Sequence, residues 1–407
     1  MSKKTAIIII RDELIPPFQE PARDILIQNV KLSKYQDDML GRFGFAVTRI
    51  SESECKQGLS KVEGGSLLLH EHLFFSPEFL QEFLEKSQGK TTRACLKKNV
   101  YTRQLAVLQD VEQLDEYLAY PLYHIAAEKE LEKAEDIVID VDEYFEEGSF
   151  PPHMLNKDNF KYSITTRPIV ALTEPLHIGL ANIAANFARI ARLRKPGLWP
   201  GLKALWAGLT AFSIDKTTIK ARALRALSVI SPTAEVHPTA VVEGSIIGPK
   251  AKIGAYAVVR FSVVGEGAFV DDHAGLKFST IGDGAYIANN NVLFFSTVYP
   301  RAFLISGPYQ FCCFGYDTAI MNSIPTDYRL DGKTIKVKTK HGLQDTGLRF
   351  AGSIIGHGTR IAAGLIFGPG RAIPKELTLY PDPARVLTKV DENLADQGNV
   401  WFLKDGV

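Results

Sequence analysis

An aliphatic side chain returns at regular intervals through the second half of the chain. Starting at Ile230 and moving in steps of six, six and five residues, every position reached is apolar: Val236, Val242, Ile247, Ile253, Val259, Val264, Val270, Leu276, Ile281, Ile287, Leu293 and Val298. The period is 17 residues, and two further columns share it: Ala234, Ala251, Ala268, Ala285, Ala302 and Ser245, Ser262, Ser279, Ser296, Cys313. Three matching columns indicate stacked structural repeats.

The spacing predicts a solenoid of very short strands. Each step of about six residues fits one strand with an inward aliphatic side chain, followed by a tight bend where a small residue or glycine fits. Three such strands make one triangular coil. Because a single coil cannot bury its own apolar face, coils stack on one another, roughly 4.8 Å apart, and form a continuous core.

The repeated segments IGPKAK, IGAYAV, IGDGAY and IGHGTR resemble the hexapeptide repeat of left-handed parallel β-helix transferases. The resemblance implies an all-β left-handed parallel β-helix, a homotrimer and ligands bound between neighbouring coils. The left hand of the coil comes from the resemblance, since the usual crossover rule would predict a right hand.

The repeat is interrupted over residues 322–349 and resumes at Ile355 in steps of six. Within the interruption, the alternating KTIKVKTK predicts a strand or hairpin arm. The interruption and resumption together resemble sugar-phosphate nucleotidyltransferases with a hexapeptide tail, which carry a similar Asp-Thr-Gly, here Asp345, Thr346 and Gly347. The family in question is the bifunctional nucleotidyltransferase/acetyltransferase group of the N-acetylglucosamine-1-phosphate uridyltransferase type.

The first part of the chain alternates strand and helix signals. AIIII (6–10), SLLLH (66–70), TTRACLKK (91–98) and EDIVIDVDEYF (135–145) are typical of strands, and Ser76 with Pro77 predicts a helix start. This order predicts an α/β domain. RDELIPPFQEPARDILIQNVKLSKYQ (11–36) resembles the opening of divergent nucleotidyltransferase domains.

This domain departs from active nucleotidyltransferases after the first strand. Active members place a Gly-rich loop there, whose backbone N–H groups hold a triphosphate. Here no glycine occurs between Ile10 and Gly41, so Arg11, Arg23 and Lys31 have no such frame. Two hypotheses follow: a Mg²⁺-dependent nucleotidyltransferase, or a degenerate domain that binds a ligand, a partner or its own tail.

We therefore divide the chain into an α/β nucleotidyltransferase-like domain (1–172), a helical linker or cap (173–228), the β-helix (229–390) with its insertion (322–349), and a tail (391–407). Thr173 and Pro175 predict the first linker helix. The second carries an apolar stripe of Leu198, Leu202, Leu205, Leu209 and Phe212. Because the first coil of a solenoid needs a cap, we expect this stripe to be core, packed on the first coil or on a neighbouring subunit. The alternative is a membrane surface contacted through Trp199 and Trp206.

One corner of the predicted coils is unusually polar. Positions nine residues after each repeat start place His273 between Tyr256 and Asn290, with Asp272, Asn289 and Asn291 nearby. A neutral histidine suits general-base catalysis of acyl transfer, and a carboxylate or amide fixes its tautomer. Hexapeptide acyltransferases commonly use one corner histidine in this way. His273 is therefore the candidate base, oriented by Asp272 or Asn290; the alternative is a solvated corner without a role.

Other polar residues carry weaker signals. Arg260 and Lys277 share a column, and two stacked cations fit either a phosphate clamp or a solvated face; Asn289 and Asn291 are further candidates for substrate contact. Phe294 and Phe311 are expected to continue that column. His70 and His72 resemble half of a metal site, but no third ligand accompanies them, so no metal is predicted.

Composition narrows the function classes. The net charge of +1 disfavours a general nucleic-acid binder, and the four cysteines show no metal or disulfide spacing, which favours a reduced, cytoplasmic protein. We expect a transferase that moves an acyl group from an acyl-CoA-type donor to a sugar phosphate or nucleotide-sugar. The alternatives are nucleotidyl transfer by the N-terminal domain, for which Mg²⁺ is required, and a non-catalytic trimeric scaffold.

Overall fold

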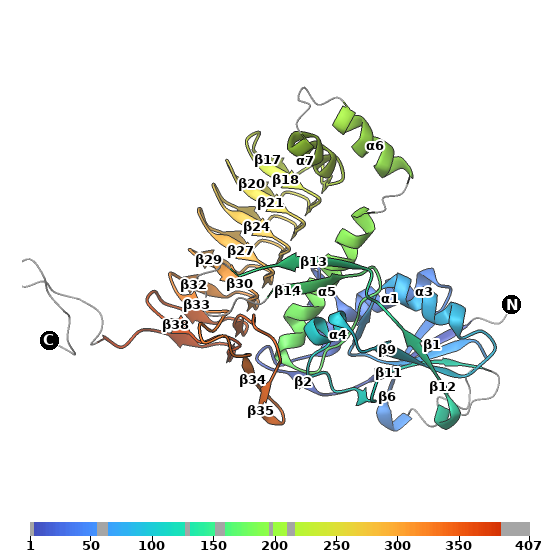
Figure 1. Cartoon of the computed structure of the whole chain (residues 1–407). Helices are drawn as coiled ribbons and strands as arrows, with labels where there is room; N and C mark the ends of the chain where they lie inside the picture. Colours follow the sequence, from blue (N-terminus) through green and yellow to red (C-terminus); the bar gives the residue numbers. More distant parts are fainter. Residues whose placement is uncertain are drawn as a thin grey trace, which may run out of the picture.

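The computed structural model describes residues 4–54, 64–126, 131–150, 159–194, 198–209 and 216–383. The N-terminal part and the β-helix lie side by side, with one long helix, α5, between them (Figure 1). Residues of both parts belong to one cluster of buried apolar side chains, which includes Ile8, Phe187, Phe295 and Ile354. The two parts therefore share a core.

The N-terminal part contains a mixed sheet in the order β12-β9-β11-β7-β1-β6. Its strands are β1 (Thr5–Ile10), β6 (Ala46–Ser51), β7 (Ser66–His70), β9 (Thr92–Lys97), β11 (Tyr117–Ile125) and β12 (Glu135–Ile139). β1 pairs in parallel with both β6 and β7, which explains its uninterrupted apolar run. The accompanying helices are α1 (Leu32–Arg42), α3 (Pro77–Lys86) and α4 (Val100–Leu105). The predicted start of α3 is confirmed: the Ser76 side chain accepts a hydrogen bond from the Phe79 N–H.

Three sheets of parallel strands confirm the β-helix. The first contains β16 (Val229–Ile230), β19 (Ile246–Ile247), β22 (Val263–Val264), β25 (Thr280–Ile281), β28 (Thr297–Val298), β31 (Cys313–Phe314), β36 (Ile354–Ile355) and β39 (Ala372–Ile373). The second contains β17 (Glu235–Val236), β20 (Lys252–Ile253), β23 (Phe269–Val270), β26 (Tyr286–Ile287), β29 (Phe303–Ile305), β32 (Ala319–Met321), β37 (Arg360–Ile361) and β40 (Thr378–Leu379). The third contains β18 (Val241–Glu243), β21 (Val258–Arg260), β24 (Gly275–Lys277), β27 (Val292–Phe294) and β30 (Tyr309–Gln310). The hand of the coil stays a prediction.

The repeat columns pair as the period predicts, from Ile230 with Ile247 to Ile281 with Val298. The serine column forms a buried ladder. The backbone N–H groups of Ser262, Ser279 and Ser296 each donate to the side-chain oxygen of the serine one coil earlier, at 3.1, 3.1 and 3.2 Å. These bonds satisfy corner N–H groups that would otherwise be buried without partners.

The fifth coil is one residue shorter than predicted. Leu293 pairs with Tyr309 and Phe294 with Gln310, so the spacing there is 16 residues. Cys312, rather than Cys313, therefore continues the serine column, and its N–H donates to the Ser296 side chain. Gln310, rather than Phe311, continues the column of Lys277 and Phe294. A strict 17-residue period continued through this shorter coil predicts Cys313 and Phe311, each one residue too far along the chain.

The insertion forms the predicted hairpin, from β34 (Lys336–Thr339) and β35 (Gly342–Asp345), which pair antiparallel. Its tip reaches the N-terminal part: the Lys340 ammonium group contacts Glu13 at 3.1 Å and Asp110 at 2.8 Å. A second short pair, β33 (Ile324–Pro325) with β38 (Ile366–Phe367), closes the last coils.

Helix α5 (Pro175–Arg194) is buried along most of its length. The predicted start at Thr173 is close to correct, but a histidine provides the cap. The Nδ1 atom of His177 accepts hydrogen bonds from the Thr173 and Glu174 N–H groups, both at 3.0 Å. Further along, the Asn186 amide contacts the Phe278 carbonyl at 3.3 Å, which ties the helix to the β-helix.

The described leucines of the stripe on α6 (Leu198–Leu209) do not pack on the first coil, contrary to one of our two expectations; packing on a neighbouring subunit stays a prediction, and the Leu198 side chain lies outside the described residues. Leu202, Leu205 and Trp206 are 48%, 58% and 69% exposed. Helix α6 packs instead on α7 (Lys216–Ala226), and α7 contacts the first coil (Figure 1). The cap is therefore α7, and the stripe of α6 points outward. The side chains of Trp199, Leu209 and Phe212 lie outside the described residues. No helix in the described ranges is long and apolar enough to cross a membrane.

The exposure of α6 makes a testable prediction about stability. Leu205→Ala removes a side chain that contacts mostly solvent, so we expect the free energy of unfolding to change by less than about 0.5 kcal/mol. The matched control Leu276→Ala empties a position that is 1% exposed, and we expect it to cost about 2–5 kcal/mol. Urea unfolding of both variants measures the difference. If both variants lost the same free energy of unfolding, Leu205 would have to be packed in an interface.

Candidate functional site

His273 lies on an exposed corner of the β-helix, between β23 and β24. Its backbone is in the left-handed region with φ 59°, as are those of Tyr256 and Asn290. The imidazole stacks on the Tyr256 ring with centroids 5.1 Å apart and planes inclined by 14°. The predicted column of Tyr256, His273 and Asn290 is therefore present. Non-glycine residues adopt this conformation at a cost of roughly 1–2 kcal/mol each.

The carboxylates beside His273 are held by other groups. The Asp272 Oδ1 atom accepts the Ala255 N–H at 2.6 Å, and the Asp271 Oδ2 atom accepts the Tyr286 hydroxyl at 2.6 Å. The Tyr286 pKa is raised, first because its hydroxyl donates to Asp271. Within the described ranges, no hydrogen bond joins His273 to Asp272 or Asn290. The corner thus brings His273, Asp272 and Asn290 together. That Asp272 or Asn290 orients the imidazole stays a prediction.

The three asparagines of this corner divide into two kinds. Asn289 and Asn290 are exposed, whereas Asn291 is fully buried. The Asn291 Nδ2 group donates to the Leu304 carbonyl at 3.2 Å, and its Oδ1 atom has no hydrogen-bond partner. Asn291 therefore contributes to the interior of the coil rather than to the exposed corner.

Arg260 and Lys277 are stacked as predicted, on β21 and β24. The Arg260 guanidinium pairs with Glu243 at 2.8 Å. The Lys277 ammonium group instead lies 5.4 Å from the centroid of the Phe278 ring and 5.3 Å from that of Phe294. In the described part of the chain Lys277 has no carboxylate partner, so it is the more available cation of the two.

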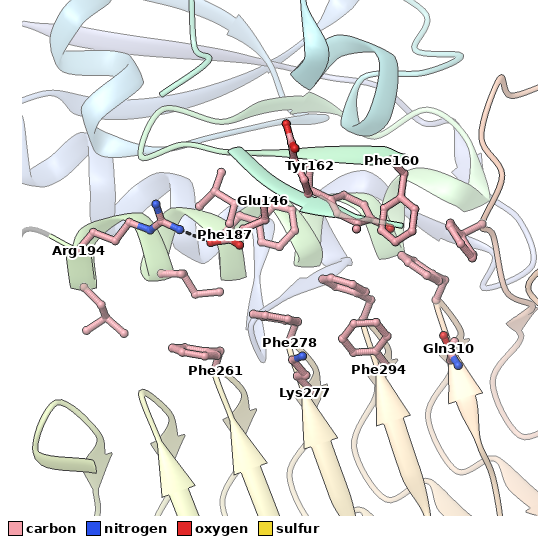
Figure 2. A pocket seen from close by; sticks show the side chains of 18 of the residues that line it. Glu146, Phe160, Tyr162, Phe187, Arg194, Phe261, Lys277, Phe278, Phe294 and Gln310 are labelled. Atoms are coloured by element: carbon pink, nitrogen blue, oxygen red, sulfur yellow. Dashed lines mark hydrogen bonds and ion pairs between the residues drawn. The ribbon is translucent and has the colours of Figure 1, made fainter. Parts of the chain in front are cut away.

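Lys277 borders a large cavity between the β-helix and the N-terminal part, with a volume of about 690 Å³ (Figure 2). A line of phenylalanines from successive coils forms one wall: Phe261, Phe278, Phe295 and Phe311. The opposite wall comes from β13 (Tyr144–Gly148), β14 (Phe160–Ile164) and α5, through Phe160, Tyr162 and Phe187. Helix α7 adds Lys220 and Leu224. We name this space the aromatic cavity.

The sequence contained a signal for the aromatic cavity that we did not use. Phe261, Phe278 and Phe295 are 17 residues apart and precede the serine column directly. Each has a positive φ, between 49° and 53°. A bulky residue repeated at a bend position is unusual, since bends favour small residues. The opposite wall could not be found in this way, because it comes from segments without the repeat.

In a nucleotidyltransferase-like domain, a nucleotide would bind beyond the carboxyl ends of β1 and β7. In this chain, charged side chains fill that edge of the sheet. Glu71, 1% exposed, accepts the Arg11 N–H at 2.9 Å and pairs with Arg23 at 3.1 Å. The cavity among these residues has a volume of only about 10 Å³. Small-molecule sites usually have several hundred Å³. This geometry gives no support to nucleotidyl transfer.

In the histidine pair of this edge, His72 is buried and His70 is partly buried. Burial lowers the pKa of His70 to about 4 and that of His72 well below its ordinary value. The rings lie edge to face, with centroids 5.6 Å apart. Within the described residues, no cluster of three histidine, cysteine or acidic side chains has metal-binding geometry.

Comparisons with known proteins add little to this geometry. No protein-family model and no curated protein matches the chain. Among solved structures, the acetyltransferase domain of PglB from Neisseria gonorrhoeae in complex with acetyl coenzyme A is 19% identical, with a TM-score of 0.15; the match covers 40% of this chain and 60% of that one. A hexapeptide transferase family protein from Anaplasma phagocytophilum is 20% identical, with a TM-score of 0.20, over 41% of this chain and 81% of that one. Matches this distant carry no functional conclusion.

The buried histidines make the stability of the protein depend on pH. His70 and His177 have pKa values of about 4 in the folded state because of burial, against an ordinary value of 6.5. Between pH 6.5 and 4 the unfolded chain binds more protons, so the free energy of unfolding falls as the pH falls, by about 1.4 kcal/mol per pH unit for each histidine. Asp327 acts in the opposite direction, because burial raises its pKa to about 6.

Asp327→Asn removes this offset, and we expect a steeper loss of stability below pH 6 than in the unmodified protein. Urea unfolding at several pH values between 7 and 4.5 measures the slope. The control is His237→Gln, whose side chain is exposed in the folded protein and should leave the slope unchanged. An unchanged slope in Asp327→Asn would contradict the burial of its carboxyl group.

Proposed function

We propose that the protein is an acyltransferase whose reaction takes place at the His273 corner. The donor is an acyl-CoA-type thioester, and the acceptor is a hydroxyl or amine of a sugar phosphate or nucleotide-sugar. The observation that carries the proposal is the His273 side chain, exposed at a left-handed corner and surrounded by Asp272, Asn289 and Asn290. Several left-handed corners of this β-helix carry residues other than glycine, so the proposal depends on the neighbours: an imidazole beside a carboxylate and two amides can accept and hold a proton.

The chemistry requires one proton acceptor. Neutral His273 takes the proton of the acceptor hydroxyl or amine as the acceptor attacks the thioester carbonyl. The new bond forms to the carbonyl carbon, the carbon–sulfur bond breaks, and sulfur leaves with the electron pair as a thiolate. The His273 imidazolium then gives its proton to this sulfur, which yields the thiol and restores the base. Asp271 and Asp272 place negative charge beside the imidazolium that forms, and their own hydrogen bonds to Tyr286 and Ala255 hold them there.

A homotrimer would complete the site, because one chain alone leaves the corner open. Tyr256 and Val292, on and beside the corner, are 59% and 46% exposed. Apolar side chains exposed around a polar group are typical of a surface that a second subunit covers. The sugar-phosphate acceptor is proposed from the resemblance of the chain to sugar-phosphate nucleotidyltransferases with a hexapeptide tail.

The first experiment measures thiol release from acetyl-CoA and longer acyl-CoA donors, with sugar phosphates and nucleotide-sugars as acceptors. We expect His273→Ala to reduce the rate about 100- to 10,000-fold without lowering the melting temperature, because a general base contributes that much. His237→Ala is the matched control: it removes another exposed histidine of the β-helix and should retain activity.

Equal rates for His273→Ala and the unmodified protein would overturn the assignment of His273. If the unmodified protein releases no thiol with any donor, the acyltransferase proposal fails. The remaining hypothesis would then be the non-catalytic scaffold.

A further inference from the structure

The phenylalanine wall of the aromatic cavity is a continuous line of stacked rings. Phe261 and Phe278 lie with centroids 5.5 Å apart and planes inclined by 9°; the corresponding values for Phe278 and Phe295 are 4.9 Å and 12°. Phe311 extends the line at 5.0 Å from Phe295. Rings at this spacing leave no gap into which a flat ligand can insert. A ligand must therefore lie along the line. Because Phe295 is only 4% exposed, such a ligand contacts mainly the partly exposed rings of Phe261, Phe278 and Phe311.

The other wall is also apolar and closes the space from the N-terminal side. Phe187 of α5 contacts Phe278 and Phe295 with edge-to-face geometry, at 6.2 and 5.7 Å between centroids. Phe160 and Tyr162 project from β14 toward the phenylalanine line (Figure 2). The body of a ligand that fills the space is therefore elongated and apolar.

Charge is concentrated among the lysines of the lining. The two lining carboxylates are both paired, Glu146 with Arg194 and Glu147 with Lys161, the latter at 3.5 Å. Lys277 and Lys220 form no ion pair within the described ranges. The Lys277 ammonium group lies over two aromatic rings, where a cation is less well hydrated than in open solvent. An anionic group on the ligand would be attracted to these two lysines.

We propose that the aromatic cavity binds a long, unbranched acyl chain that carries an anionic head group, with the chain along the phenylalanine line and the head group at Lys277. The volume fits this occupant: a methylene group is about as large as a water molecule, roughly 30 Å³ in the liquid. The cavity of about 690 Å³ therefore holds a long hydrocarbon chain.

The acyl-chain site is separate from the proposed catalytic corner. His273 precedes β24, and Lys277 ends it. The chain turns at His273, with φ 59°, before it enters β24, so the two Cα atoms lie at most roughly 13 Å apart, and the two side chains belong to different parts of the coil. Binding in the aromatic cavity is therefore independent of whether His273 catalyses acyl transfer, and a His273→Ala protein should bind the acyl chain normally.

Isothermal titration of the full chain with palmitate and decanoate, both below their micelle concentrations, tests the site. We expect tighter binding of palmitate, by about fourfold for each added methylene group until the cavity is full. Palmityl alcohol, which lacks the charge, should bind more weakly than palmitate. Titrations with palmitoyl-CoA and with a palmitoyl lysophosphatidate compare two natural sources of such a ligand, a thioester and a phospholipid.

Two variants locate the ligand. Lys277→Gln should weaken palmitate about tenfold and leave palmityl alcohol unchanged, since it removes only the charge. Leu224→Trp fills the cavity from α7 and should weaken both ligands. The matched control is Lys252→Gln, on the second sheet and outside the cavity, which should bind both ligands like the unmodified protein.

Several results would overturn the proposal. They are the absence of palmitate binding, an affinity that does not depend on chain length, or equal effects of Lys277→Gln and Lys252→Gln. If the unmodified protein releases thiol but does not bind palmitate, only the acyl-chain site in the aromatic cavity is rejected. Palmitate binding without thiol release would reject the catalytic proposal alone.

Discussion

The in-register stacking of the coils is the constraint on which the rest of the structure depends. Each coil pairs with the next through only two or three residues per strand, so a slip of one residue would turn the inner aliphatic side chains outward. The missing residue of the fifth coil shows how strictly the register is kept. It is absorbed at the corner between β29 and β30, and the strands on both sides remain paired, Leu304 with Ile320 and Leu293 with Tyr309.

The same register builds the surface on which the N-terminal part packs. The serine ladder satisfies the N–H groups inside one corner, and the residue before each serine places a phenylalanine on the outside. Polar contacts then fix the N-terminal part on this side. The Tyr299 hydroxyl accepts the Leu26 N–H at 2.9 Å, and the Asn29 amide donates to the Ile281 carbonyl at 2.7 Å. The first of these contacts is buried and the second is partly buried. Breaking the buried contact would leave an unsatisfied polar group, which makes the arrangement specific.

Most of the fold could be predicted from the sequence, because its signals are local or periodic. The aliphatic columns, the hairpin at 336–345 and the cap at Ser76 each depend on residues close in the chain or spaced by one coil. The missed features depend on distant partners. Nothing near Phe278 indicates that Phe187 and Tyr162 face it, and nothing within α6 shows that α7, rather than its own leucines, caps the first coil. His273 and Lys277 could be proposed as site residues because their columns are periodic, and the same columns predicted the neighbours Tyr256 and Phe294.

The way in which the N-terminal part packs against the β-helix explains why the aromatic cavity lies between them. In parallel sheets, ligands usually bind beyond the carboxyl ends of the strands, which here means beyond β1 and β7. That edge is occupied by the ion pair of Arg23 with buried Glu71, and the hairpin of the β-helix adds Lys340 against Glu13 and Asp110. Displacing Arg23 would leave the Glu71 carboxylate buried and unpaired, at a cost of about 3–5 kcal/mol.

The β-helix thus helps to close the edge where a nucleotide would bind, while its phenylalanine line forms one wall of an open cavity on the side that faces α5. An apolar ligand can enter that cavity without breaking an ion pair of Lys277, because in the part of the chain that the structure describes this ammonium group has no carboxylate partner.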